Sequence, residues 1–208
     1  DTEDRMGKCK AAVEADALGR ARDCQEETGF VLAREADCSV ALQALREGKL
    51  PLRVTHNDTK LNNVLMDEKT GVGVCIIDLD TVMPGLSIND FGDSIRFGAN
   101  HSAEDETDLS KVNLDLELFS AYTAAFLEGA GGALTDGELE YLPWGAKLMT
   151  LECGIRFLTD YLEGDHYFHT SRPGQNLDRC RTQFKLVSDM EANWARLGEI
   201  VAEHRSRP

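Results

Sequence analysis

The sequence lacks long apolar runs and any excess of positive charge. No apolar run approaches the roughly 20 residues that a membrane-spanning helix needs, and no basic segment followed by an apolar one stands at its start. Lys and Arg number 22 against 37 Asp and Glu, a formal net charge of −15 at pH 7. Binding to nucleic-acid phosphates or an anionic membrane needs the opposite balance. We therefore expect neither partner, and a cytoplasmic location.

Cysteine pairs with metal-binding spacing are also missing. The six cysteines stand at positions 9, 24, 38, 75, 153 and 180, without a Cys-x-x-Cys pair or a histidine at zinc-ligand spacing. We expect them to be buried free thiols of a reduced intracellular protein. The chain also begins without methionine, which suggests a processed or shortened product.

The pattern of apolar residues predicts an α+β fold that is mainly α-helical, in one domain covering residues 1–208. Residues 1–50 form leading helices, over 6–28 and 35–47. Residues 51–97 hold a β-hairpin, with strands at 64–66 and 72–77 joined by a turn rich in Asp, Lys and Gly.

Residues 98–208 carry apolar stripes at helical spacing over 114–132, 139–161 and 187–201, which we expect to be core. The acidic stretch 100–110 has no such period. It predicts a mobile surface loop.

One segment carries recognisable chemistry. Residues 54–65 fit His-x-Asp-x-x-x-x-Asn running into a strand, with His56, Asp58 and Asn63 at the named positions. Phosphoryl transfer to a hydroxyl needs a carboxylate that orients the nucleophile and accepts its proton, and an amide oxygen that holds a metal on the phosphates. Asp58 suits the first role and Asn63 the second.

A second acidic motif follows the hairpin. Its second strand ends at Asp78, with Asp80 two residues on. One carboxylate, one amide oxygen, water and phosphate oxygens make a ligand set that Mg²⁺ prefers. An acidic protein that handles phosphates also needs a bound metal to offset their repulsion. We therefore expect Asn63 and Asp78 to bind Mg²⁺.

Together these motifs resemble the aminoglycoside phosphotransferase and choline kinase group, relatives of the protein kinases. Residues 54–64, 77–85 and 90–96 are most similar to the bacterial N-acetylhexosamine 1-kinases, and the likeness extends through residues 156–162 and 176–177. The fold implied is the C-terminal lobe of the protein kinase-like fold. The activity implied is ATP- and Mg²⁺-dependent phosphorylation of a sugar hydroxyl, specifically the anomeric hydroxyl of an N-acetylhexosamine.

The resemblance implies further roles around the loop. Asp58 would be the catalytic base, Asn63 and Asp78 the magnesium ligands, and Asp80 a helper for a second metal. Lys60 resembles a catalytic-loop lysine that neutralises the transferring phosphate, although an ordinary surface lysine fits equally well.

Three more residues near these motifs are expected to support the loops. His56 would anchor the backbone through a ring nitrogen. Residues 90–92 spell Asp-Phe-Gly, the protein-kinase metal motif, but lie 27 residues past Asn63 and beyond Asp78. We interpret Asp90 and Asp93 as acceptors of backbone hydrogen bonds that hold the loops around the site.

The sugar acceptor is assigned by the resemblance alone. It places acceptor contacts at Arg156 and Tyr167 in the helical part. The alternative to a sugar-binding role is that Glu152, Arg156 and Asp160, spaced by four, form ordinary ion pairs on one helix face.

A kinase of this type holds ATP between two lobes, and the smaller lobe supplies a strand lysine and a phosphate-covering loop. Neither feature precedes His56, so we expect an N-terminal lobe elsewhere in a longer protein and very low activity of this chain alone. Two alternatives remain: a non-catalytic kinase-like binding module, and a haloacid-dehalogenase-like phosphatase with Asp78 as nucleophile.

Overall fold

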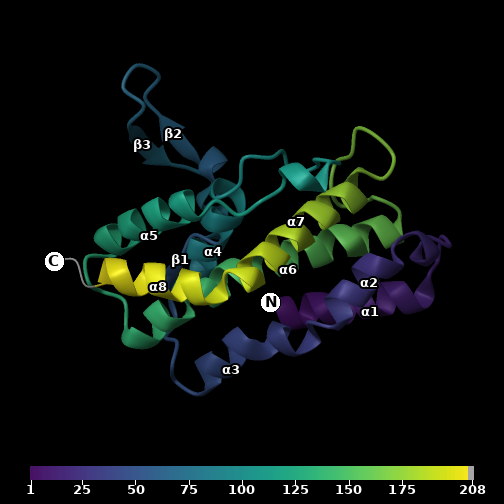
Figure 1. Cartoon of the computed structure of the whole chain (residues 1–208), viewed down its shortest axis with the longest axis horizontal. Coiled ribbons are helices and arrows are strands. Elements are labelled where there is room, and N and C mark those ends of the chain that lie inside the picture. The colour runs from purple at the N-terminus through teal and green to yellow at the C-terminus, as the bar shows by residue number, and fades with distance from the viewer. Residues whose placement is uncertain (206–208) are drawn as a thin grey trace.

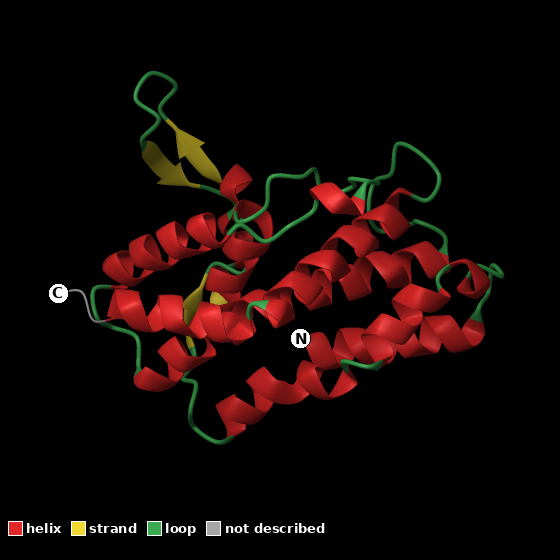
Figure 2. Cartoon of the chain, viewed as in Figure 1, coloured by secondary structure: helices red, strands yellow, loops and turns green. Residues whose placement is uncertain are grey.

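Helices dominate the architecture (Figure 2). The computed structural model describes residues 1–205. The helices are α1 Thr2–Ala15, α2 Gln25–Leu32, α3 Val40–Arg46, α4 Ser87–Gly98, α5 Leu116–Ala130, α6 Asp136–Glu163, α7 Gln175–Ala192 and α8 Trp194–Arg205. The strands are β1 Arg53–Thr55, β2 Val64–Met66, β3 Gly73–Ile76 and β4 Met83–Gly85. This combination fits the α+β, mainly helical kinase-like fold expected.

The long helix α6 lies at the centre and packs against α1, α4, α7 and α8 (Figure 1). A capping box at Thr135 and Glu138 starts it, and Gly164 ends it in the left-handed conformation. One core cluster gathers around its C-terminal half, where Phe184 of α7 packs. The other gathers around its N-terminal half, where α4 and α5 contribute Phe91 and Phe119. Helix α6 therefore joins the two halves of the core.

Helices α4 and α6 cross with their backbones in contact. A Cβ atom on Gly92 would overlap the carbonyl of Gly145, and one on Gly145 would overlap the carbonyl of Ile88. Phe91, beside the crossing, is fully buried. The Asp-Phe-Gly triplet at 90–92 is thus part of helix α4, and its glycine serves close packing.

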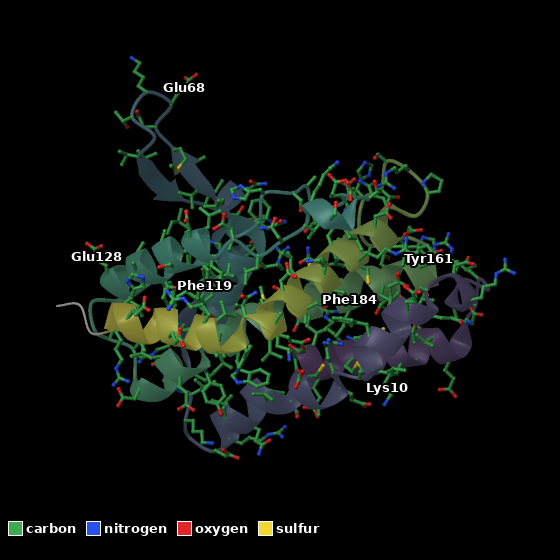
Figure 3. The ribbon with its side chains drawn as sticks, viewed as in Figure 1. Lys10, Glu68, Phe119, Glu128, Tyr161 and Phe184 are labelled. Atoms are coloured by element: carbon green, nitrogen blue, oxygen red, sulfur yellow. The ribbon has the colours of Figure 1, made fainter. Side chains whose placement is uncertain are left out.

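The strands form two separate antiparallel pairs. The expected hairpin is present, with β2 pairing β3, and every residue of β3 is exposed. It projects from the helical body, and Figure 3 shows Glu68 at its tip. We expected only this β element, but β1 also pairs with β4, Thr55 opposite Met83. Three-residue strands so far apart in sequence carry too little local signal to be predicted.

Several predicted boundaries are wrong. The helix expected over 6–28 is divided, because α1 ends at Ala15, the next residue Asp16 is left-handed, and α2 begins only at Gln25. Residues 35–39 form a 3₁₀ helix before α3. The last stripe, 187–201, spans the break between α7 and α8 at Asn193.

The expectation that all six cysteines are buried also needs revision. Cys75 is exposed and Cys153 half-buried, whereas the other four free thiols are buried as expected. The irregular stretch at 100–108 is tied to the body by Glu104, whose carboxylate pairs with Arg96 and whose carbonyl accepts from Thr182. Within residues 1–205, no helix is both long and apolar enough to cross a membrane.

The Glu138 side chain connects β1 and α4, which come before and after the polar loops in the sequence. Its carboxylate accepts from Arg53 of β1 at 3.0 and 2.7 Å, from Ser87 of α4 at 2.6 Å and from the Thr135 backbone at 2.8 Å. Burial opposes its ionisation, but these hydrogen bonds outweigh burial and lower the pKa of Glu138 to about 2.

We expect Gly92→Ala to lower the free energy of unfolding by about 1–3 kcal/mol, because the added methyl group must push α4 away from α6. Urea unfolding measures this change. The control is Gly198→Ala at an exposed position on α8, where a Cβ meets open space. It should stabilise by about 0.5–1 kcal/mol. Equal effects at the two positions would contradict the close crossing.

Glu138→Gln should remove a pH-dependent part of the stability. The folded-state pKa lies below the unfolded value of 4.5, so this stabilisation is present above about pH 4.5 and is lost as pH falls towards about 2. Its full size is about 3 kcal/mol. Urea unfolding of wild type and variant between pH 7 and pH 3 should show a gap that narrows with acid. Glu140→Gln, at an exposed site on the same helix, is the control.

Candidate active site

The loop after β1 brings Asp58, Lys60 and Asn63 together. Asp58 Oδ2 accepts hydrogen bonds from Lys60 Nζ and Asn63 Nδ2, each at 2.8 Å. Asn63 Nδ2 also donates to the Asp58 carbonyl at 2.8 Å, which closes the loop on itself. Asn63 is buried and ends a short 3₁₀ helix that feeds β2. The sequence spacing of five residues thus becomes a direct contact.

The surroundings of Asp58 favour its ionised form. Partial burial raises its pKa, but the hydrogen bonds from Lys60 and Asn63 and the positive charge of Lys60 outweigh burial, and the net pKa is lowered. Both contacts use Oδ2. Among the described residues, no donor contacts Oδ1, so this oxygen can accept a proton from a bound hydroxyl.

Asp78 follows β3 in the left-handed conformation, at φ 64° and ψ 52°. It lies close to Asp80, and the hydrogen bond between the two carboxyl groups, reinforced by their like charge, raises the pKa of Asp78. Two acidic groups held so close repel each other when both are ionised. A bound cation would relieve this repulsion.

A backbone contact places Asp78 beside the first loop. The N–H of Ile77, the preceding residue, donates to the Asn63 carbonyl at 2.9 Å. Both amide hydrogens of Asn63 Nδ2 are used within the loop, so Oδ1 is the atom of that side chain suited to a metal. No group of three His, Cys, Asp or Glu at metal-binding distances occurs in residues 1–205. Carboxylate and amide oxygens such as those of Asn63, Asp78 and Asp80 are nevertheless the type of ligand that a hard cation prefers.

His56 connects the two loops through both of its ring nitrogens. Its Nε2 lies 3.0 Å from the Ile77 carbonyl, and its Nδ1 lies 3.3 Å from the Asp58 backbone nitrogen. The carbonyl can only accept and the N–H can only donate, so the hydrogen bonds assign the neutral tautomer with the proton on Nε2. His56 thereby holds Ile77, the residue before Asp78, close to the backbone of Asp58, the candidate base.

Asp90 of α4 holds the backbone of the loop that carries Asp58. Its Oδ2 accepts from the His56 N–H and its Oδ1 from the Asn57 N–H, both at 2.8 Å. Burial raises the pKa of Asp90, and these two hydrogen bonds act in the opposite direction. Asp93 differs from our expectation, because its carboxylate pairs with Arg96 at 2.9 Å. Asp90 and Asp93 lie one turn apart on α4, and of the two carboxylates only that of Asp90 accepts hydrogen bonds from the loop backbone.

Arg156 of α6 and Tyr167 of the segment that follows it lie together. Arg156 Nη2 is 3.3 Å from the Tyr167 hydroxyl, and the guanidinium stacks over the rings of Tyr167 and Phe168. A pocket there is also lined by Arg5, Lys8, Thr159, Asp160 and Glu163. In the described part of the chain, no hydrogen bond or ion pair joins this pocket to residues 56–80.

The ion pairs considered between Glu152, Arg156 and Asp160 do not form among the described residues. Glu152 accepts from Thr2, and Asp160 accepts from the backbone N–H groups of residues 166, 167 and 168. Asp160 therefore anchors the segment that carries Tyr167.

Sequence reasoning missed four polar residues that fasten the loops. Thr59 Oγ1 donates to the Asp90 carbonyl, and Ser94 Oγ donates to the Thr59 carbonyl. Asn57 and Thr81 link the two loops directly. The one available signal was an asparagine between His56 and Asp58, since asparagine tolerates the left-handed conformation that this turn uses.

Fold and site define a kinase-like phosphotransferase. The comparison with known families agrees: residues 1–129, more than half of the chain, match the phosphotransferase enzyme family. The chain belongs to that family. The family match also argues against the phosphatase alternative, which needs alternating strands and helices after Asp78. All regular elements described after β4 are helical.

Asp90→Asn should loosen the loop locally. The amide can accept at one atom only, so at least one bond to a charged acceptor, worth about 1.5–3 kcal/mol, is lost. We expect the His56 and Asn57 amides to exchange hydrogen about 10- to 100-fold faster, as measured by NMR. Asp93→Asn is the control, because Asp93 contacts Arg96 rather than these amides. Unchanged exchange in Asp90→Asn would contradict the anchoring role.

Proposed function

We propose that the protein carrying this chain transfers the γ-phosphoryl group of ATP to a sugar hydroxyl, most specifically the anomeric hydroxyl of an N-acetylhexosamine, with Mg²⁺. The observation that carries this proposal is the arrangement of Asp58. One oxygen of its carboxylate is held by Lys60 and Asn63, and the other has no donor among the described residues. That geometry suits a base that orients a hydroxyl nucleophile.

Each loop residue then has a distinct task. Asp58 accepts the hydroxyl proton, and its lowered pKa keeps it ionised for this purpose at neutral pH. Lys60, beside Asp58, would neutralise charge on the transferring phosphate. Asn63 and Asp78, with Asp80 assisting, would hold Mg²⁺, which when bound offsets the negative charge of the ATP phosphates. His56 and Asp90 hold the two loops in position relative to each other.

The pocket around Arg156 and Tyr167 is the proposed acceptor region. Its guanidinium and phenol groups can donate hydrogen bonds to sugar hydroxyl or acetamido oxygens, and its aromatic rings can stack on a sugar face. This part of the proposal rests on the resemblance to N-acetylhexosamine kinases.

A second lobe is the proposed partner of the hairpin. The apolar side chains around it are largely exposed: Leu65, Met66, Val72, Val74, Ile76 and Leu79. A two-stranded hairpin is marginally stable alone, and exposed apolar patches of this kind mark binding surfaces. In a two-lobed kinase, an N-terminal lobe and the nucleotide would cover this surface. We therefore propose that the chain acts as the catalytic lobe of a longer protein, with very low activity alone.

Asp58→Asn in the full-length protein should reduce the rate of sugar phosphorylation by about 10²- to 10⁴-fold, the usual contribution of a positioned general base. ADP release measures the rate, and ³¹P NMR of the product tests for a phosphate on the anomeric carbon. Asp108→Asn, in the exposed stretch after Glu104, is the control and should retain wild-type activity.

The wild-type protein also distinguishes the proposed kinase activity from a non-catalytic binding role. A wild-type protein that binds Mg²⁺ and nucleotide but phosphorylates no sugar would favour the non-catalytic module. A wild-type rate that Asp58→Asn leaves unchanged would contradict the assignment of the base.

A further inference from the structure

Asn57 has two features that its place beside the candidate base does not require. Its backbone adopts the left-handed conformation, at φ 63°. Its side chain points back across the loop, where Nδ2 donates to the Thr81 carbonyl at 3.0 Å and to the Thr55 carbonyl at 3.3 Å. Thr81 belongs to the 3₁₀ helix Leu79–Thr81, directly after Asp78. The side chain thus spans from the base loop to the acidic loop.

A second hydrogen bond runs in the opposite direction. Thr81 Oγ1 donates to the His56 carbonyl at 2.7 Å, so residues 56–57 and residue 81 exchange a reciprocal pair of bonds. The Asn57 amide is oriented by its surroundings, because Nδ2 faces two carbonyls while Oδ1 lies 3.0 Å from the Thr55 hydroxyl. That hydroxyl also lies 3.0 Å from the Met83 carbonyl.

The neighbouring strand leaves room for this arrangement. Gly85 of β4 faces the Thr55 and Asn57 side chains, and a Cβ atom there would collide with Thr55 Oγ1 and lie 3.0 Å from Asn57 Oδ1. Asn57, Thr55 and Thr81 therefore form a fitted cluster between the base loop and the acidic loop.

We propose that Asn57 is a positioning residue that sets the spacing between Asp58 and the metal-binding Asp78. The inference rests on the proposed function, because it assigns the cluster a task in that reaction. Asp58 is covalently next to Asn57, and Asp78 lies three residues before Thr81. Fixing Asn57 on Thr81 fixes the two carboxylates relative to each other. Contacts that orient ligands in this way are worth about 10- to 100-fold in metal affinity or activity.

The alternative is that asparagine serves only the left-handed turn. Glycine adopts the same conformation without strain, so Asn57→Gly retains the turn and removes only the side-chain bonds. Asn57→Asp is the second variant. It tolerates the same conformation, keeps an acceptor near Thr55, and places a carboxylate oxygen against the Thr81 carbonyl in place of the donor.

The test measures Mg²⁺–ADP binding to the full-length protein by calorimetry, together with kcat, the acceptor KM and thermal stability. Both variants should bind Mg²⁺–ADP about 10- to 100-fold more weakly and show a lower kcat. The acceptor KM should change less than about twofold and Tm by no more than about 2 °C, since the fold is retained.

Each outcome of this test either supports or overturns the inference about Asn57. Weaker Mg²⁺–ADP binding with an unchanged acceptor KM supports it. Wild-type Mg²⁺–ADP affinity in both variants overturns it, whether or not Tm falls, because Asn57 then serves the fold alone. A wild-type protein that binds no Mg²⁺–ADP overturns the proposed function as well, and so distinguishes the two failures.

Discussion

The two hydrogen bonds from the loop backbone to Asp90 are the constraint on which the site depends. They attach His56 and Asn57, each at 2.8 Å, to a half-buried carboxylate on α4. Helix α4 is in turn fixed by its close crossing with α6, where Gly92 meets the Gly145 backbone. Charge-assisted bonds to a rigid helix give a loop a defined position that the loop alone cannot maintain. The central helix of the core therefore determines where the candidate base lies.

The contacts to the acidic loop are made by the two residues that Asp90 holds. His56 reaches the carbonyl before Asp78, and Asn57 reaches the carbonyl of Thr81, so the acidic loop is held by the same two residues that Asp90 fixes. The site gathers carboxylate and amide oxygens around a single lysine, in a protein of net charge −15. Such a site handles phosphates only with a cation, which is why the proposed chemistry needs Mg²⁺.

The sequence predicted the features whose signal is local. The His-x-Asp-x-x-x-x-Asn spacing became the contact between Asp58 and Asn63, and two short apolar runs separated by a turn segment predicted the hairpin. It failed where distant segments decide the outcome. The pairing of β1 with β4 and the different partners of Asp90 and Asp93 depend on which residues the fold brings together. The exposure of Cys75 on β3 likewise follows from a hairpin that the described residues leave uncovered.

The most direct test is to locate the bound metal. Mn²⁺ with ADP, added to the isotope-labelled protein as a paramagnetic substitute for Mg²⁺, should broaden the NMR signals of Asn63, Asp78 and Asp80 first. Asp78→Asn should abolish this broadening. Broadening centred instead on the acidic stretch 104–108, or unaffected by Asp78→Asn, would contradict the claim that the two loops form one magnesium and phosphotransfer site.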